Sequence, residues 1–207
     1  MQYYFSRCRY LKDMSSYKVN EIYLKLREEI LNGFFSEHSM VKSVVCKKER
    51  AEISLPVRVN FSGTWTDAMP YCVQKGGEVV NMAVTVDGGK PIKVTAEKIK
   101  EKQIVFSSDG VSEIFSFDKL QTGEELSDFN LHRAVLETVG INKDTEIEDG
   151  FRLSTQVSLI DKGSGLGVSS ILLGGCFKVL GELLGKKYTD EEIFRMVFVA
   201  EQIMKTG

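Results

Sequence analysis

Several features that point to particular classes of protein are scarce in this sequence of 207 residues. The four cysteines form no Cys-x-x-Cys pair and there are only two histidines, which argues against a zinc site. Lys and Arg number 27 against 29 Asp and Glu, so the chain lacks the basic excess on which nucleic-acid binding depends. No apolar run approaches the roughly 20 residues that cross a bilayer. We therefore expect a globular protein that binds neither nucleic acid nor membrane.

The cysteines also indicate in which cellular compartment the protein is located. Cys8, Cys46, Cys72 and Cys176 are widely spaced, and we interpret them as free thiols in a reducing environment. The first residues, MQYYFSRCRYLKDM, contain neither an apolar signal core nor a small-residue cleavage site. These observations together predict a cytoplasmic protein.

The first fifty residues differ in pattern from the rest. Apolar residues recur there at helical spacing with charged residues between them. They are Val19, Ile22, Tyr23, Leu26, Ile30 and Phe34. The pattern predicts an amphipathic helix that ends at Asn32-Gly33. We expect residues 1–50 to form a helical arm or linker and residues 51–207 to form the main domain.

Beyond Val41 the period changes to two, which is typical of strands. Strands are predicted at 41–48, 52–59, 79–86, 91–96, 103–106, 114–117 and 151–159, and helices at 124–139, 171–184 and 190–204. Strands that come first, with helices gathered late, indicate an α+β fold rather than a parallel βαβ repeat. His132 lies on the first of these late helices, and we expect it at the surface or at an interface.

The segment Lys162–Ser170, KGSGLGVSS, lies between a predicted strand and a predicted helix. Its three glycines allow backbone conformations in which amides converge on an anion. The helix that follows adds the positive end of its dipole, and the serine hydroxyls add donors or a Mg²⁺ ligand. The spacing matches neither the P-loop nor the dinucleotide fingerprint. The segment predicts a phosphate-binding loop, with a plain glycine-rich turn as the alternative.

A second segment, RVNFSGTWTD, gathers polar and aromatic residues at a strand end. Arg58 can neutralise a phosphate or orient a carboxylate. Asp67 can accept hydrogen bonds from vicinal hydroxyls, and Trp65 offers an apolar face to a sugar ring. The alternative is a polar turn whose tryptophan packs in the core.

Together the two segments resemble the first and second motifs of the GHMP sugar kinases, which include galactokinase and the homoserine, mevalonate and phosphomevalonate kinases. Within that family the chain resembles most the L-fucokinases, including the kinase half of bifunctional fucokinase/fucose-1-phosphate guanylyltransferases. The resemblance runs from about residue 53 to residue 207. It rests on RVNFSGTWTDAMPYCVQKGGEVVNMAVTVDGGKPI, FNLHRAVLETVGI and KGSGLGVSSILLGG. It implies the N-terminal, ATP-binding domain of the family, with a mixed or antiparallel sheet and helices packed on one side.

The resemblance also implies chemistry: ATP and Mg²⁺ as cofactors, and transfer of the ATP γ-phosphate to the 1-hydroxyl of a sugar, with L-fucose as the expected substrate. By the family's motifs, Arg58 supplies charge and orientation in catalysis, and Arg58, Trp65 and Asp67 bind the substrate. The second motif would bind the nucleotide, with Ser169 also a ligand of Mg²⁺. Its members are Lys162, Gly163, Ser164, Gly165, Leu166, Gly167, Val168, Ser169 and Ser170.

The chain also departs from the family pattern. Asp161 stands where the family has proline, and Thr64 where fucokinases have glycine, which bears on affinity more than on fold. In fucokinases a segment like 201–207 leads into a glycine-rich stretch that carries the catalytic aspartate. We therefore expect the N-terminal part of a kinase, inactive alone and self-associating through apolar surface that a C-terminal domain would cover. The alternatives are a heptose-phosphate or other GHMP sugar kinase, a non-catalytic binding relic, or a complementing subunit.

Overall fold

The computed structural model describes residues 16–64, 66, 75–116, 129–160 and 166–205. Its elements, in chain order, are α2 (Ser16–Glu37), β1 (Ser43–Val44), β2 (Arg50–Leu55), β3 (Val57–Ser62), β4 (Val80–Val84), β5 (Ile92–Ile99), β6 (Ile104–Ser108), β7 (Val111–Ile114), α4 (Asn130–Thr138), β8 (Glu146–Ile147), β9 (Gly150–Val157), α5 (Val168–Leu183) and α6 (Asp190–Met204).

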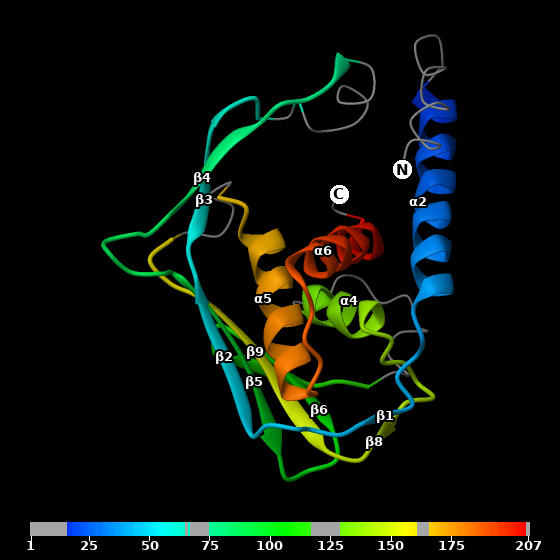
Figure 1. Cartoon of the computed structure of the whole chain (residues 1–207), viewed down its shortest axis with the longest axis vertical. Helices are drawn as coiled ribbons and strands as arrows, with labels where there is room; N and C mark the ends of the chain where they lie inside the picture. The colour runs from blue at the N-terminus through cyan, green and yellow to red at the C-terminus, as the bar shows by residue number, and fades with distance from the viewer. Residues whose placement is uncertain (1–15, 65, 67–74, 117–128, 161–165, 206–207) are drawn as a thin grey trace.

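A five-stranded sheet in the order β2-β5-β9-β6-β7 forms the base of the fold. Its strand pairs are antiparallel except for β6 and β9, which run parallel. Helix α5 packs across β2, β5 and β9, and α4 and α6 pack against α5 and each other on the same side (Figure 1). The α+β prediction, with a mixed sheet and helices on one side, is thereby confirmed.

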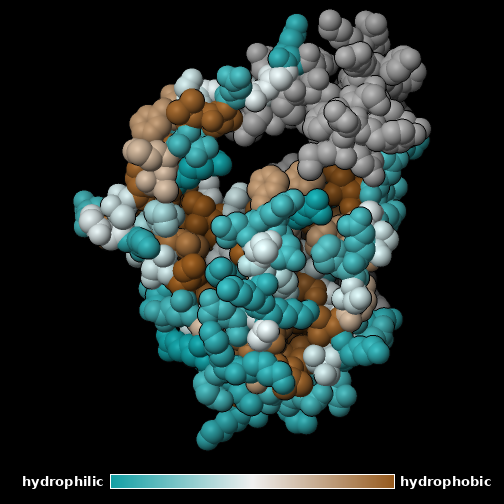
Figure 2. Space-filling model, in the orientation of Figure 1, coloured by the Kyte–Doolittle hydropathy of each residue, from teal (hydrophilic) through white to brown (hydrophobic). Residues whose placement is uncertain are grey.

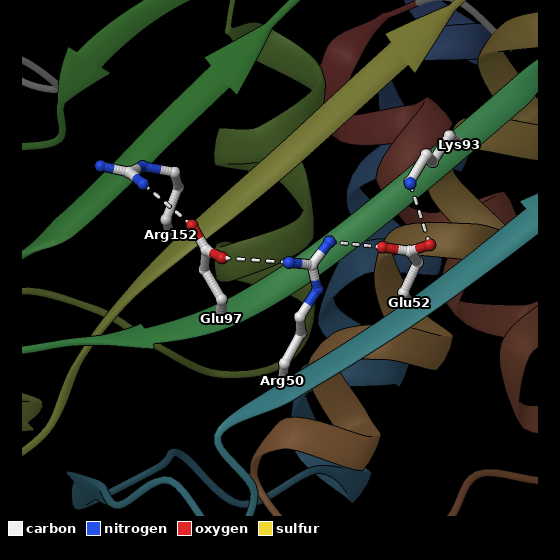
Figure 3. Close-up of polar contacts among 5 residues, drawn as sticks. All are labelled: Arg50, Glu52, Lys93, Glu97 and Arg152. Carbon is white, nitrogen blue, oxygen red and sulfur yellow. Dashed lines mark hydrogen bonds and ion pairs between the residues drawn. The ribbon is translucent and has the colours of Figure 1, made fainter.

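Alternation along the strands separates the two faces of this sheet. On β5, Ile92, Val94 and Ala96 are fully buried toward the helices. The opposite face carries charged side chains joined across the strands by ion pairs (Figure 3). These residues are Arg50, Glu52, Lys93, Glu97 and Arg152. Because exposed pairs of this kind contribute little stability, the free energy of folding comes mainly from the apolar face.

Strands β3 and β4 form a separate antiparallel ribbon that extends away from the sheet at the upper left of Figure 1. Apolar surface lies along this ribbon (Figure 2), where Phe61, Val80 and Met82 are each more than half exposed. The break between β2 and β3 falls at Pro56, which has no backbone N–H to continue a ladder. The predicted single strand 52–59 is therefore divided between the sheet and the ribbon.

Helix α6 spans 190–204 as predicted, because a capping box between Thr189 and Glu192 fixes its start. The predicted end of the first helix at Asn32-Gly33 was wrong, since α2 continues to Glu37. Gly33 does not take a left-handed conformation there, and Phe34 extends the apolar face onto the core.

His132 was also predicted wrongly, because it lies in the core at 2% exposure rather than at a surface. Its ring packs against Phe106 and Phe129, with centroid distances of 5.2 and 5.4 Å. Its Nε2 lies 3.3 Å from the Thr155 hydroxyl. Burial lowers the pKa of the His132 imidazole from 6.5 to about 4, so the neutral ring is the form that the fold accommodates.

The N-terminal segment makes contact with the rest of the chain at several places. Helix α2 packs against α6, and β1 pairs in parallel with β8. The backbone N–H of Cys46 donates to the Asp149 carboxylate at 2.9 Å. The boundary at residue 50 stays a prediction. Within the described part of the chain, no helix is both long and apolar enough to span a membrane.

Candidate functional site

The site forms where β3 meets the first turn of α5. The backbone N–H of Arg58 donates to the carbonyl of Leu166 at 3.1 Å. Gly167 follows with a left-handed φ of 68° and is the N-cap residue of α5. A β-carbon at Gly167 would lie 3.1 Å from Nε and 3.2 Å from Cζ of Arg58, so the guanidinium packs directly on this glycine. The structure therefore brings one residue of the first motif against the second motif.

The N-terminus of α5 has no side-chain cap. Gly167 has no side chain to cap the helix, and no acidic residue lies in the first turn. Uncapped amides at the start of a helix, together with the helix dipole, form a binding site for anions. The Arg58 guanidinium beside them adds a full positive charge, so this corner can bind a phosphate group.

Two serines follow the glycines and differ in their surroundings. Ser169 is exposed, whereas the Ser170 hydroxyl donates to the Glu201 carboxylate of α6 at 2.5 Å. Glu201 was not predicted as a site residue, because only the packing of α6 on α5 brings it to this turn. The signal available in the sequence was a single carboxylate within the apolar stretch VFVAEQIM.

Hydroxyl and carboxylate oxygens are the donors that Mg²⁺ prefers, so this corner fits that ion chemically. The described residues include no group of three or more His, Cys, Asp or Glu that could hold a metal. Mg²⁺ at phosphate-binding sites commonly takes one or two carboxylates and completes its shell with phosphate oxygens and water, so a small set of protein oxygens is compatible with this ion.

The ribbon next to this corner carries two polar atoms that are shielded from solvent. They are Nε of Arg58 and Oδ1 of Asn60, and neither has a hydrogen-bond partner within the described ranges. Residues two apart on a strand point to the same side, so both lie on one face of β3. Buried polar groups are nearly always satisfied, which makes this pair of atoms a candidate ligand contact.

A tight turn ends β3 just before the predicted sugar-binding residues. The Thr66 hydroxyl lies 2.7 Å from the Gly63 carbonyl and 3.0 Å from the Glu78 carbonyl, and it accepts from the Glu78 N–H at 3.2 Å. Gly63 has a φ of 75°. Thr66 thus joins the turn at Gly63 that follows β3, called the motif turn below, to Glu78, which lies shortly before β4.

Several predicted site residues lie outside the described residues, namely Trp65, Asp67, Lys162, Gly163, Ser164 and Gly165, together with Asp161. Thr64, the other departure from the family pattern, is exposed. Of the predicted set, the structure places Arg58 and residues 166–170 at one corner, and their roles stay predictions.

Comparisons with known proteins show which family this chain is similar to. Residues 130–207 match the family model described as the GHMP kinases N terminal domain. The chain is 34% identical over 189 residues to a bifunctional fucokinase/GDP-fucose pyrophosphorylase from Arabidopsis thaliana, covering 87% of this chain and 18% of that protein. It is 32% identical over 221 residues to an L-fucokinase/L-fucose-1-P guanylyltransferase from Bacteroides fragilis, covering 97% of this chain and 23% of that protein.

Among solved structures, a Lactococcus lactis galactokinase complexed with galactose superimposes with a TM-score of 0.58. Sequence identity is 21%, and the match covers 77% of this chain and 39% of that one, so it establishes a shared fold. The chain thus spans about a fifth of the length of the two curated relatives and well under half of the galactokinase.

Proposed function

We propose that the chain is the ATP-binding region of an ATP-dependent sugar kinase of the GHMP family, whose N-terminal domain model matches residues 130–207. The observation that carries this proposal is the packing of the Arg58 guanidinium on Gly167, at the uncapped start of α5. A cation and a helix N-terminus at one point form a site for the transferred phosphoryl group. Residues 162–170 would bind the ATP phosphates, and Arg58 would stabilise the charge that develops during transfer.

Mg²⁺ is the proposed metal, with Ser169 as a ligand. When bound, the ion would neutralise charge on the nucleotide phosphates. Glu201 supports this assignment, because its carboxylate lies at the same turn and already accepts a hydrogen bond from Ser170. We add Glu201 to the proposed set of residues that hold the ion in place. The exposed Ser169 hydroxyl is free of the α6 contact that Ser170 makes, which suits a ligand that faces the nucleotide.

The proposed substrate is L-fucose, phosphorylated at its 1-hydroxyl, with Arg58, Trp65 and Asp67 as the sugar contacts. Both curated relatives carry fucokinase in their names, which supports this choice over other sugars. Because the chain spans about a fifth of the two curated relatives, this transfer is proposed as the activity of the whole protein.

Asp67→Asn tests the sugar assignment. Loss of the carboxylate charge should weaken L-fucose binding by roughly 10-fold, because hydrogen bonds to a charged acceptor are the stronger ones. Binding of Mg²⁺ and a non-hydrolysable ATP analogue should change little. Isothermal titration of both ligands against both proteins measures this difference. If nucleotide affinity fell while fucose affinity stayed, the two assignments would have to be exchanged.

We further propose that the chain self-associates. Phe194 and Phe198 lie one turn apart on α6 at 68% and 43% exposure, and apolar side chains in contact with water favour association. Light scattering should report a dimer or larger species, and a clean monomer would contradict this.

Cys46 and Cys176 are free thiols, which supports the proposed cytoplasmic location.

A further inference from the structure

We propose that Asn60 is a specificity-determining residue of the sugar site, whose side-chain oxygen accepts a hydrogen bond from a substrate hydroxyl. The inference rests on the proposed function, and it adds a residue that neither the motif pattern nor the resemblance had assigned. It is carried by the two unpaired polar atoms on β3 and by the irregular pairing that follows them.

Asn60 lies two residues after Arg58, so the two side chains leave β3 on the same face. The Arg58 side chain on that face reaches Gly167, at the start of α5. Asn60 is therefore next along the strand from the corner that would bind the phosphate, and closer to the motif turn at Gly63.

The hydrogen bonding of Arg58 and Asn60 is incomplete among the described residues. Within the described residues, four side-chain atoms are buried without a hydrogen-bond partner, and two of them are Arg58 Nε and Asn60 Oδ1. Leaving a buried polar atom unpaired is unfavourable, and native structures tolerate it mainly where a ligand or water completes the bond. Two such atoms at neighbouring positions of one strand face point to one ligand.

The backbone of β3 is irregular directly after Asn60. β3 pairs regularly with β4 as far as Asn60, which lies opposite Asn81, and the register then shifts so that Ser62 lies opposite Val80. Such bulges reorient side chains and are frequent beside active sites. Here the irregularity falls directly after Asn60, between it and the motif turn.

The hydrogen-bonding chemistry of these two side chains decides which class of ligand fits them. An amide oxygen can only accept a hydrogen bond, and a guanidinium N–H can only donate one. A ligand that satisfies both must present a proton donor and an acceptor side by side. A hydroxyl does both, whereas the oxygens of a fully ionised phosphate only accept. The Asn60 end of this face therefore fits a polyol such as a sugar, and the Arg58 end fits either a sugar oxygen or a phosphate.

The test compares Asn60→Ala with Asn81→Ala, the exposed cross-strand partner of Asn60 and thus a matched control. Calorimetry on the 207-residue chain would measure binding of L-fucose, of its monodeoxy analogues, and of Mg²⁺ with a non-hydrolysable ATP analogue. Asn60→Ala should lose roughly 10-fold in fucose affinity and nothing in nucleotide affinity. Asn81→Ala should match the wild type for both. Asn60→Asp, which keeps an acceptor oxygen, should restore most of the fucose binding.

The deoxy series separates recognition from folding. In the wild type, one monodeoxy sugar should bind about 10-fold more weakly than L-fucose, and Asn60→Ala should bind that analogue and L-fucose equally. Asn60→Ala that binds L-fucose as the wild type does would overturn this inference and leave the proposed function standing. So would an equal loss for every analogue, since that pattern reports damage to the fold. A wild-type chain that binds nucleotide but no sugar would overturn both.

Discussion

Replacing Gly63 with alanine is expected to reduce sugar binding by more than about 100-fold and to lower the free energy of unfolding by about 2–3 kcal/mol. Gly63 has a φ of 75°, and a β-carbon there would lie 1.8 Å from the Glu78 carbonyl oxygen and 2.9 Å from its carbon. These are backbone atoms, so no side chain can rotate away to relieve the overlap. The chain would have to separate at this point, which breaks the Thr66 hydrogen bonds that fix the motif turn.

Gly76→Ala is the matched control for this prediction. Gly76 has nearly the same φ, 76°, but no atom of the described residues lies within 4 Å of a β-carbon built on it. It should therefore show only the conformational cost of a left-handed alanine, about 1 kcal/mol, with sugar binding retained. Denaturant unfolding and fucose titration of both variants give the comparison. Equal effects of the two substitutions would mean that contact with Glu78 does not matter.

Acidification from pH 7 to pH 4.5 is expected to lower the stability of the wild-type chain by about 2 kcal/mol through His132 alone. Burial lowers the pKa of this imidazole to about 4 in the folded state, against 6.5 in its ordinary state. The unfolded chain therefore takes up the proton first. The contribution of His132 to stability is complete above pH 6.5 and is lost as the pH falls from 6.5 toward 4.

One substitution tests whether His132 is the source of this loss. His132→Phe keeps an aromatic ring beside Phe106 and Phe129 but cannot titrate, so its stability should fall by about 2 kcal/mol less than that of the wild type over the same range. Urea unfolding at pH 7 and pH 4.5 measures the difference. Parallel pH curves for wild type and His132→Phe would show that the ring is not buried in its neutral form.

Local patterns in the sequence determined some elements well. The start of α6 follows from Thr189 and Glu192, which form a capping box within four consecutive residues, so no distant contact was needed to place it. The same local logic failed at Gly33. Glycine often ends a helix, but here the apolar Phe34 gains more from packing on the core than the chain gains from turning.

His132 shows why burial is harder to predict than helix formation. The helix around it was expected, but which face would lie against the sheet depends on contacts with Phe106 and Thr155, which are distant in sequence. A histidine on a helix that also carries Arg133 and Glu137 is compatible with a surface position until those contacts are known.

The candidate site, too, could be predicted from the sequence only in part. The glycine-rich segment and the Arg58 segment were each recognisable, because unusual backbone freedom and clustered polar residues leave local signals. Their approach across the fold, with Arg58 against Gly167, was implied by the family resemblance and not by spacing. Glu201 and Asn60 were missed, since a lone carboxylate on a helix and a lone amide on a strand have no local signature. Glu201 is recognised by its hydrogen bond with Ser170, and Asn60 by a buried side-chain oxygen that has no hydrogen-bond partner among the described residues.

Nucleotide binding at the start of α5 is tested most directly by a titration of the isotopically labelled chain with Mg²⁺ and a non-hydrolysable ATP analogue, followed by backbone amide chemical shifts. We expect saturable shifts at Gly167, Val168, Ser169 and Ser170, with accompanying shifts at Arg58, because these amides lie at the corner where β3 meets α5. Omitting Mg²⁺ should weaken the binding. Shifts confined to β6 and β7 at the far edge of the sheet, or no saturable shift at all, would show that the nucleotide does not bind at this corner.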